Sequence, residues 1–133
     1  MLSRREWLAA MAASPLAAAE YPQHPRDVTK PFEAAAFKAA QEAGKPLLVD
    51  VFAPWCPTCK AQHKVLESLA AKPEYAGVTV FQVDYDNQAG VVKAFSANQQ
   101  STLIAFKGAK ETGRSVGSTK AEAIEALLAS TLE

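Results

Sequence analysis

The sequence predicts a single α/β domain in which helices cover both faces of a central, mostly parallel sheet. Short apolar segments alternate along the chain with segments of helical periodicity, which is the pattern of such folds. The segment 46–53, PLLVDVFA, is apolar enough to be a strand buried on both faces. A chain of 133 residues with a hydrophobic fraction of 49% can bury one core of this kind.

Residues 1–19 have the pattern of a signal peptide, which is removed before the mature protein folds. Arg4 and Arg5 precede a mildly apolar segment, 7–16, and the alanines at 17–19 fit a cleavage site. The apolar segment is too short to span a membrane. Such a signal would carry the protein across the inner membrane into the periplasm, an oxidising compartment.

The segment 3–8, SRREWL, resembles a twin-arginine export signal, in which paired arginines precede an aromatic residue and a leucine. Trp7 stands where that signal usually has phenylalanine, so an ordinary secretory signal is the alternative. Both interpretations predict export.

Residues 20–30 show no periodicity and are predicted to be a linker to a domain over residues 31–133. Thr29 is predicted to cap the first helix, with Pro31 in its first turn and Gly44 at its end. The apolar residues of this helix recur at helical spacing and are Phe32, Ala36, Ala39, Ala40 and Ala43.

The remaining elements continue the alternation of strands and helices. A helix begins at Cys59, and its apolar face consists of Val65, Leu66, Leu69 and Ala70. The other predicted elements are strands at 78–85, 102–107 and 111–117 and helices at 87–95 and 120–132. The turn at Gly108 makes the last two strands a hairpin, which adds an antiparallel edge to the sheet.

The charge balance gives no argument for two classes of partner, nucleic acid and the membrane surface. Fourteen basic and fourteen acidic side chains give a formal net charge of zero. A neutral chain offers no electrostatic footprint for nucleic acid and no polybasic surface for a membrane.

Both cysteines of the chain lie in the segment 50–60, DVFAPWCPTCK. A disulfide between Cys56 and Cys59 closes almost no loop, so it would contribute little to the stability of the fold. A tetrahedral zinc site needs two ligands beyond this pair. The nearest candidate ligand is His63, one helical turn after Cys59.

Thiol–disulfide exchange fits the placement of the pair better. Cys56 follows a strand and begins a helix, where unpaired N–H groups and the helix dipole favour a thiolate. The thiolate is the attacking species in disulfide exchange, and Cys59, one turn further on, can resolve the mixed disulfide. A C-x-x-C pair near a βαβ pattern is typical of redox proteins.

The run 48–60, LVDVFAPWCPTCK, together with 102–107 and the later Val116 and Gly117, resembles the thioredoxin superfamily. The resemblance covers nearly all of the chain from Phe32 onward and implies a thioredoxin fold. That fold has a central four-stranded mixed sheet with helices on both faces. The chain also resembles the thioredoxin-like domains of exported bacterial disulfide reductases, which implies a shortened or missing first strand.

By position, the resemblance makes Cys56 the catalytic nucleophile, Cys59 the catalytic resolving thiol and Asp50 a catalytic buried acid. Trp55 would shield the disulfide and contact partners. Asp50 is the one charge in an apolar strand, and Gln82 stands where many thioredoxins have a lysine. Burial without a cation should raise the pKa of Asp50 and suit it to take the proton of Cys59. An acid held by local hydrogen bonds is the alternative.

The resemblance also assigns Pro57, Thr58 and Lys60 to the environment of the active site. The dipeptide Pro57-Thr58 is neither the Gly-Pro that is frequent in the family's reductants nor the Pro-His that is frequent in its oxidants. It therefore does not indicate the direction of electron flow.

Ser101, followed by Thr102, stands where the family usually has a cis-proline facing the disulfide. A cis bond before a residue other than proline costs about 3 kcal/mol. Either the Gln100–Ser101 bond is trans and the loop is reshaped, or the fold bears the strain. A serine hydroxyl beside Cys56 could also hydrogen-bond the thiolate.

We therefore expect a periplasmic protein-disulfide oxidoreductase that acts as a reductase, with no cofactor beyond its redox-active Cys56–Cys59 disulfide. The expected partners are protein disulfide substrates and a membrane-embedded thiol reductant as electron donor. We expect no nucleic-acid partner and a monomer. One alternative is a metal-binding or metal-delivery protein that uses Cys56, Cys59 and His63. Another is a redox-inert thioredoxin-like binding module.

Overall fold

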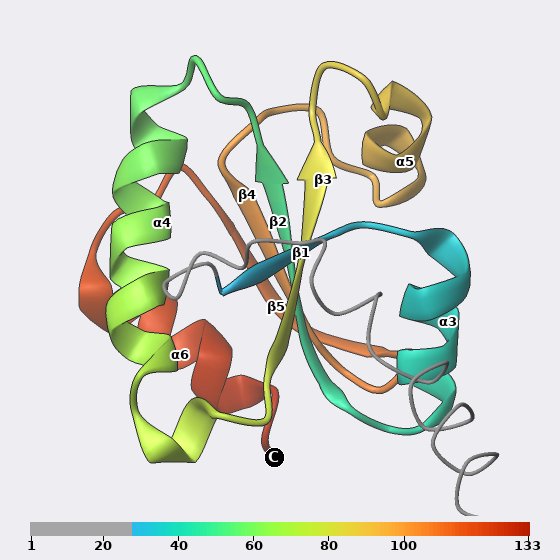
Figure 1. Ribbon diagram of the computed structural model, residues 1–133, viewed down its shortest axis with the longest axis vertical. Coiled ribbons are helices and arrows are strands. Elements are labelled where there is room, and N and C mark those ends of the chain that lie inside the picture. Colours follow the sequence, from blue (N-terminus) through green and yellow to red (C-terminus); the bar gives the residue numbers. More distant parts are fainter. Residues whose placement is uncertain (1–27) are drawn as a thin grey trace, which may run out of the picture.

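The computed structural model describes residues 28–133, which form a five-stranded mixed sheet with helices on both faces (Figure 1). The strand order is β1-β3-β2-β4-β5. The strands are β1 (Thr29–Pro31), β2 (Pro46–Phe52), β3 (Thr79–Asp84), β4 (Thr102–Lys107) and β5 (Lys110–Val116). Strands β1, β3 and β2 run parallel, whereas β4 is antiparallel to both β2 and β5. The predicted signal peptide, 1–19, and most of the predicted linker lie outside the described residues.

Helices α4 and α6 cover one face of the sheet, and α3 and α5 cover the other (Figure 1). The helices are α3 (Ala34–Glu42), α4 (Pro57–Ala70), α5 (Ala89–Ala94) and α6 (Ala121–Ser130), with a short 3₁₀ helix, η1 (Pro73–Tyr75), after α4. No helix within residues 28–133 is both long and apolar enough to cross a membrane.

The predicted α/β architecture is confirmed. The first strand was expected to be shortened or missing; it is present but short, so the sheet has five strands rather than the predicted four. Thr29 and Pro31 were expected to begin a helix and instead belong to β1, which pairs with β3 at the edge of the sheet. A strand of three residues is too short to show the period of two that identifies strands in a sequence. Pro31 is tolerated because an edge strand does not need every N–H group. The helix begins three residues later, at Ala34.

Helices α5 and α6 begin without a side-chain cap. The N-cap positions of α5 and α6 are Gln88 and Lys120, and neither side chain makes a capping hydrogen bond. Asn87, which precedes the N-cap position of α5, donates from its side-chain amide to the carboxylate of Asp84 over 2.9 Å. This bond closes the turn after β3.

The core is divided into two layers by the sheet, and β2 contributes to both. Leu48 packs with the residues of α4 and α6, whereas Leu47, Val49 and Val51 pack on the side of α3 and α5. Because side chains alternate along a strand, Asp50 projects to the same face as Leu48, the face that α4 covers. The only charge of β2 is therefore directed into the core below the helix that carries the cysteines.

Phe37 is the centre of an aromatic cluster between α3 and the sheet. Its ring is 7% exposed and lies 5.3–5.5 Å from four other rings, measured between centroids. These rings belong to Phe32, Phe81, Phe95 and Phe106, and three of the four contacts are edge-to-face. Edge-to-face contacts add to the stabilisation that burial of the rings provides.

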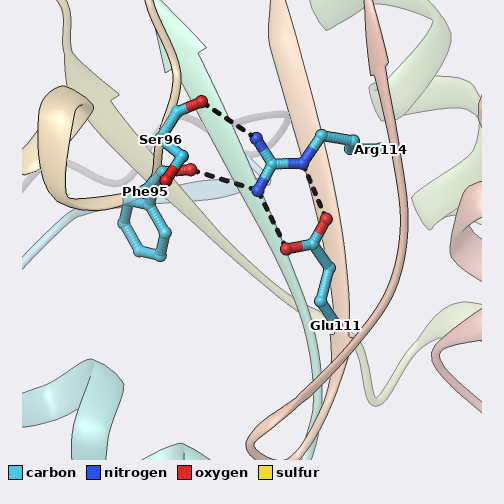
Figure 2. A network of polar contacts seen from close by, with 4 residues as sticks. All are labelled: Phe95, Ser96, Glu111 and Arg114. Carbon is cyan, nitrogen blue, oxygen red and sulfur yellow. Dashed lines mark hydrogen bonds and ion pairs between the residues drawn. The ribbon is translucent and has the colours of Figure 1, made fainter.

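Arg114 of β5 holds the beginning of the connection between α5 and β4 (Figure 2). Its guanidinium donates to the carbonyl oxygens of Phe95 and Ser96 over 3.1 and 3.4 Å. The same group forms a bidentate ion pair with Glu111, with N–O distances of 2.6 and 2.8 Å. Ser96 has a positive φ of 56°, which the carbonyl contacts help to hold. The connection that leads to Ser101 is therefore fastened at its start.

We predict that Phe37→Ala lowers the free energy of unfolding by about 3–5 kcal/mol, because it removes a large buried ring and leaves a cavity. Urea denaturation measures the change. Lys38→Ala, at an exposed position of the same helix, is the control and should change stability by less than about 0.5 kcal/mol. A loss below about 1 kcal/mol for Phe37→Ala would contradict the central role of this ring.

Candidate active site

The two cysteines are placed by the start of α4. The chain leaves β2 at Phe52, and Cys56 has the extended backbone of an N-cap residue, with φ −92° and ψ 114°. Its sulfur accepts a hydrogen bond from the backbone N–H of Cys59 over 3.1 Å. Pro57 occupies the first turn, where its missing N–H costs nothing. A helix terminus with free N–H groups therefore faces the sulfur of Cys56.

Both thiols are free and almost fully buried, with 2% of Cys56 and none of Cys59 exposed. The other side chains of the motif are more exposed than the two thiols. Pro57 and Lys60 are exposed and Thr58 is half-buried. The sulfur atoms therefore lie just beneath a surface that the residues of the motif form.

Among residues 28–133, Trp55 is the most exposed of the large apolar residues, at 57%. Its indole Nε1–H donates to the carboxylate of Asp86 over 2.9 Å. The ring also meets Tyr85 edge-on, with centroids 6.4 Å apart. The loop after β3 therefore fixes the orientation of an exposed aromatic ring next to Cys56, as a surface for partner contact requires.

Ser101 lies in a loop whose peptide bonds are all trans, as are those of the rest of residues 28–133. Of the two alternatives for this position, the trans bond is therefore the one that the structure adopts. Ser101 has a positive φ of 67°, which a residue other than glycine adopts only when its surroundings hold it. Its N–H donates to the carbonyl oxygen of Val51 over 2.8 Å, and its own carbonyl accepts from the N–H of Gly117 over 2.9 Å.

The hydroxyl of Ser101 contacts both sulfur atoms. Its Oγ lies 3.2 Å from Sγ of Cys56 and 3.1 Å from Sγ of Cys59, and the residue is 4% exposed. Sequence reasoning predicted a hydroxyl beside Cys56 but not the contact with Cys59. The neighbouring Thr102 takes no part in these contacts, since its hydroxyl donates to the carbonyl of Gln99 over 2.7 Å and shapes the loop.

Gln62 is a member of the site that sequence reasoning missed. It is fully buried on α4, and its amide donates to the carbonyl oxygens of Ser101 over 3.1 Å and of Ser118 over 2.9 Å. It thus ties the cysteine helix to two loops. The helical spacing of the sequence could have identified Gln62, because this residue lies on the same buried face of α4 as Cys59, Leu66 and Leu69. A polar residue on such a face calls for buried partners.

The surroundings separate the pKa values of the two thiols. Burial acts to raise the pKa of Cys56, but hydrogen bonds from the Cys59 thiol, the Ser101 hydroxyl and nearby backbone groups outweigh it and lower the pKa below its ordinary value of 9.0. Burial and the hydrogen bond with Cys56 raise the pKa of Cys59, and Ser101 only partly offsets this. Cys56 is therefore the thiol that ionises first and Cys59 keeps its proton.

Asp50 is a buried acid within the apolar strand β2. It is 1% exposed, and neither carboxylate oxygen has a hydrogen-bond partner among the described residues. Burial raises its pKa from 3.8 to about 7, and a weak interaction with Gln82, its neighbour across the parallel β3, only partly opposes the rise. The alternative of an acid held by local hydrogen bonds does not fit this environment. A carboxyl group that titrates near neutral pH is suited to proton transfer.

The residues proposed for a metal site are not arranged as one. Within residues 28–133, no three His, Cys, Asp or Glu side chains are grouped closely enough to hold a metal ion. His63 instead packs against Phe52, with ring centroids 6.3 Å apart, and its Nδ1 is buried without a hydrogen-bond partner. The geometry therefore gives no support to a metal-binding or metal-delivery role for Cys56, Cys59 and His63.

Comparison with known proteins places this chain among thioredoxins. The sequence profile of the thioredoxin family matches residues 28–130. A thioredoxin of Chlamydia trachomatis is 45% identical over 71 residues, which are 53% of this chain and 68% of the relative. The thiol:disulfide interchange protein DsbE of Pasteurella multocida is 45% identical over 53 residues, which are 39% of this chain and 27% of the relative.

Solved structures agree with this result. The protein Trxlp of Edwardsiella tarda is 43% identical and superposes with a TM-score of 0.71, over 74% of this chain and 95% of that chain. A thioredoxin of Malassezia sympodialis, at 22% identity and a TM-score of 0.69 over 85% of this chain and 100% of its own, shares the fold. The fold predicted from the cysteine motif is thus confirmed as the thioredoxin fold.

We predict that Asp50→Asn removes a pH dependence of stability. Because the folded state raises the pKa of Asp50 to about 7, this group stabilises the fold fully below about pH 4, and the contribution is lost as the pH rises through about 7. The stability of the wild type minus that of the variant should therefore fall by about 2–4 kcal/mol across this range. Urea denaturation of both proteins with reduced thiols measures it, and parallel pH curves would contradict the burial of an uncompensated acid.

Proposed function

The chain belongs to the thioredoxin family, whose thiol–disulfide chemistry its C-x-x-C pair can perform, and we propose that it reduces protein disulfides in the periplasm. The observation that carries thiol–disulfide exchange as the activity is the asymmetry of the two thiols. Cys56 is held as the hydrogen-bonded N-cap of α4 and ionises readily, whereas Cys59 lies deeper and keeps its proton. An attacking thiolate backed by a protonated partner is the arrangement that exchange through a mixed disulfide needs.

In the first step, the thiolate of Cys56 attacks one sulfur of a substrate disulfide. A bond forms between Sγ of Cys56 and that sulfur, the substrate S–S bond breaks, and the leaving substrate thiolate takes a proton from solvent. Trp55, exposed and fixed by Asp86, offers the apolar surface against which a substrate chain would pack.

In the second step, Cys59 loses its proton and attacks the sulfur of Cys56. Asp50 would take that proton, since its pKa of about 7 leaves it partly ionised at neutral pH, and the strand alternation directs it beneath α4. The mixed disulfide breaks and the second substrate thiolate leaves. Two electrons have passed to the substrate, and the enzyme keeps a Cys56–Cys59 disulfide.

The next cycle requires an external dithiol that reduces the Cys56–Cys59 disulfide. We propose a membrane-embedded thiol reductant as this donor, because the predicted signal peptide at 1–19 would separate the protein from cytoplasmic reductants. The partial likeness to an interchange protein named DsbE also supports thiol–disulfide exchange as the activity. The alternative of a redox-inert binding module has no observation in its favour, since both thiols and their hydrogen bonds are in place.

We predict that the mature protein accelerates the reduction of insulin by dithiothreitol and that Cys56→Ser abolishes the acceleration. Turbidity of the released insulin chains measures the rate. Cys59→Ser should also lose turnover but should accumulate a mixed disulfide through Cys56, which mass spectrometry detects.

The exposed Ser68 of α4 provides the control, because Ser68→Ala should retain the full rate. A wild-type rate no higher than that of dithiothreitol alone would overturn the proposed reductase activity. A mixed disulfide that forms equally well in Cys56→Ser would overturn the assignment of the nucleophile.

A further inference from the structure

We propose that Ser101 is a third catalytic side chain, whose hydroxyl donates a hydrogen bond to the thiolate of Cys56 while it accepts one from the thiol of Cys59. In this way a single hydroxyl selects which of two adjacent sulfur atoms carries the negative charge. The inference deepens the proposed function, on which it rests, by assigning a residue outside the C-x-x-C motif to its chemistry. The carrying observation is that one buried Oγ lies within 3.2 Å of both sulfur atoms.

The count of donors and acceptors favours a charge on Cys56. A hydroxyl has one hydrogen to donate and two lone pairs to accept with. With Cys56 as the thiolate, its sulfur accepts from the Ser101 hydroxyl and from the backbone N–H of Cys59. The single thiol hydrogen of Cys59 then has three acceptors within reach, which are Oγ of Ser101, the thiolate of Cys56 and the carbonyl oxygen of Val51. Every polar hydrogen of the cluster then has an acceptor.

A negative charge on Cys59 instead of Cys56 would create unfavourable contacts. A thiolate on Cys59 would face the carbonyl oxygen of Val51, which lies 3.9 Å from its sulfur and is an acceptor. The backbone N–H of Cys59 would then point at a neutral thiol of Cys56, which is only a weak acceptor. Cys59 is also the more deeply buried of the two, so a charge there would be less well solvated.

The loop holds the hydroxyl in place through the backbone of Ser101. The N–H donates to Val51, and the carbonyl accepts from both Gly117 and the buried amide of Gln62. With both backbone groups held and φ fixed at 67°, the side chain is confined to the space between the sulfur atoms. Gln62 is thus a positioning residue, which acts on the cysteines through Ser101.

The same hydroxyl can serve both steps of the exchange. In the reduced enzyme it donates to the thiolate of Cys56, which attacks. In the mixed disulfide the sulfur of Cys56 is neutral, so the hydroxyl is released to donate to Cys59 as that thiol ionises. Ser101 forms no covalent bond and carries no electrons, and the proton of Cys59 passes to Asp50.

The decisive measurement is the acid dissociation of Cys56 in the reduced full chain, obtained from the pH dependence of its alkylation by iodoacetamide, with the site resolved by mass spectrometry. Two variants remove the hydroxyl with opposite effects on the backbone. Ser101→Ala keeps a side chain at a positive φ, whereas Ser101→Gly relieves that conformation. Both should lower the acid dissociation constant of Cys56 about tenfold, because a hydrogen bond to a charged group is lost.

The controls separate the hydroxyl from other causes. Ser115→Ala removes a different serine hydroxyl, one that is buried without a hydrogen-bond partner on β5, and should leave Cys56 unchanged. The other ionisable groups close to the pair in the chain or packed at the site are Asp50, Lys60, His63, Tyr85 and Asp86. None of these groups forms a hydrogen bond with either sulfur in the structure, and all are retained in every variant.

Gln62→Met tests the positioning role, since methionine fills similar space without an amide donor. It should lower the acid dissociation constant of Cys56 in the same direction as the Ser101 variants but less than tenfold, because the hydroxyl is loosened rather than removed.

An unchanged acid dissociation constant in both Ser101→Ala and Ser101→Gly would overturn the proposal. A change in only one of them would also overturn it, because the backbone would then be the cause. Since alkylation uses no disulfide substrate, a failure of insulin reduction in the wild type would overturn the proposed function separately. A potential measured in glutathione buffers provides a second readout, in which a tenfold shift corresponds to about 30 mV toward more negative values in the variants.

Discussion

The site depends on one backbone hydrogen bond, from the N–H of Ser101 to the carbonyl oxygen of Val51 over 2.8 Å. It lies where the antiparallel β4 begins beside the end of β2, immediately before the register pair of Thr102 and Val51. The connection into β4 and the loop between β2 and α4 meet at this end of the sheet (Figure 1). The bond therefore brings a loop that is 42 residues away in sequence from Cys59 into contact with both thiols.

The ionisation of the site follows from which buried groups receive hydrogen bonds. Burial disfavours charge on Asp50, Cys56 and Cys59 alike. Only Cys56 receives enough donors to reverse this effect, because it caps a helix and meets a hydroxyl. Asp50 lies in the apolar strand β2 with Gln82 as its polar neighbour, so its carboxyl group titrates near neutral pH. The site thus combines one ready thiolate, one retained proton and one acid able to accept it.

The sequence predicted those parts of the fold that local patterns determine. Strand β2 was recognisable from its continuous apolar run, and the cysteines were correctly placed at the start of α4, because an N-terminal helix position has its own residue preferences. The edge strand β1 was missed because three residues carry no period. The contact of Ser101 with Cys59 and the role of Gln62 could not be predicted from the sequence alone. Both depend on how β4 and β5 bring separate loops to one helix. Long-range register, rather than local propensity, decided these contacts.

The direction of electron flow is the central claim, and the reduction potential of the Cys56–Cys59 pair tests it most directly. Equilibration of the full chain with glutathione buffers of defined ratio, followed by quantification of the free thiols, measures this potential. For a reductase we expect a value near the roughly −270 mV of thioredoxin, at which the dithiol reduces most protein disulfides. A value near about −120 mV, which is typical of a strong periplasmic oxidant, would contradict it.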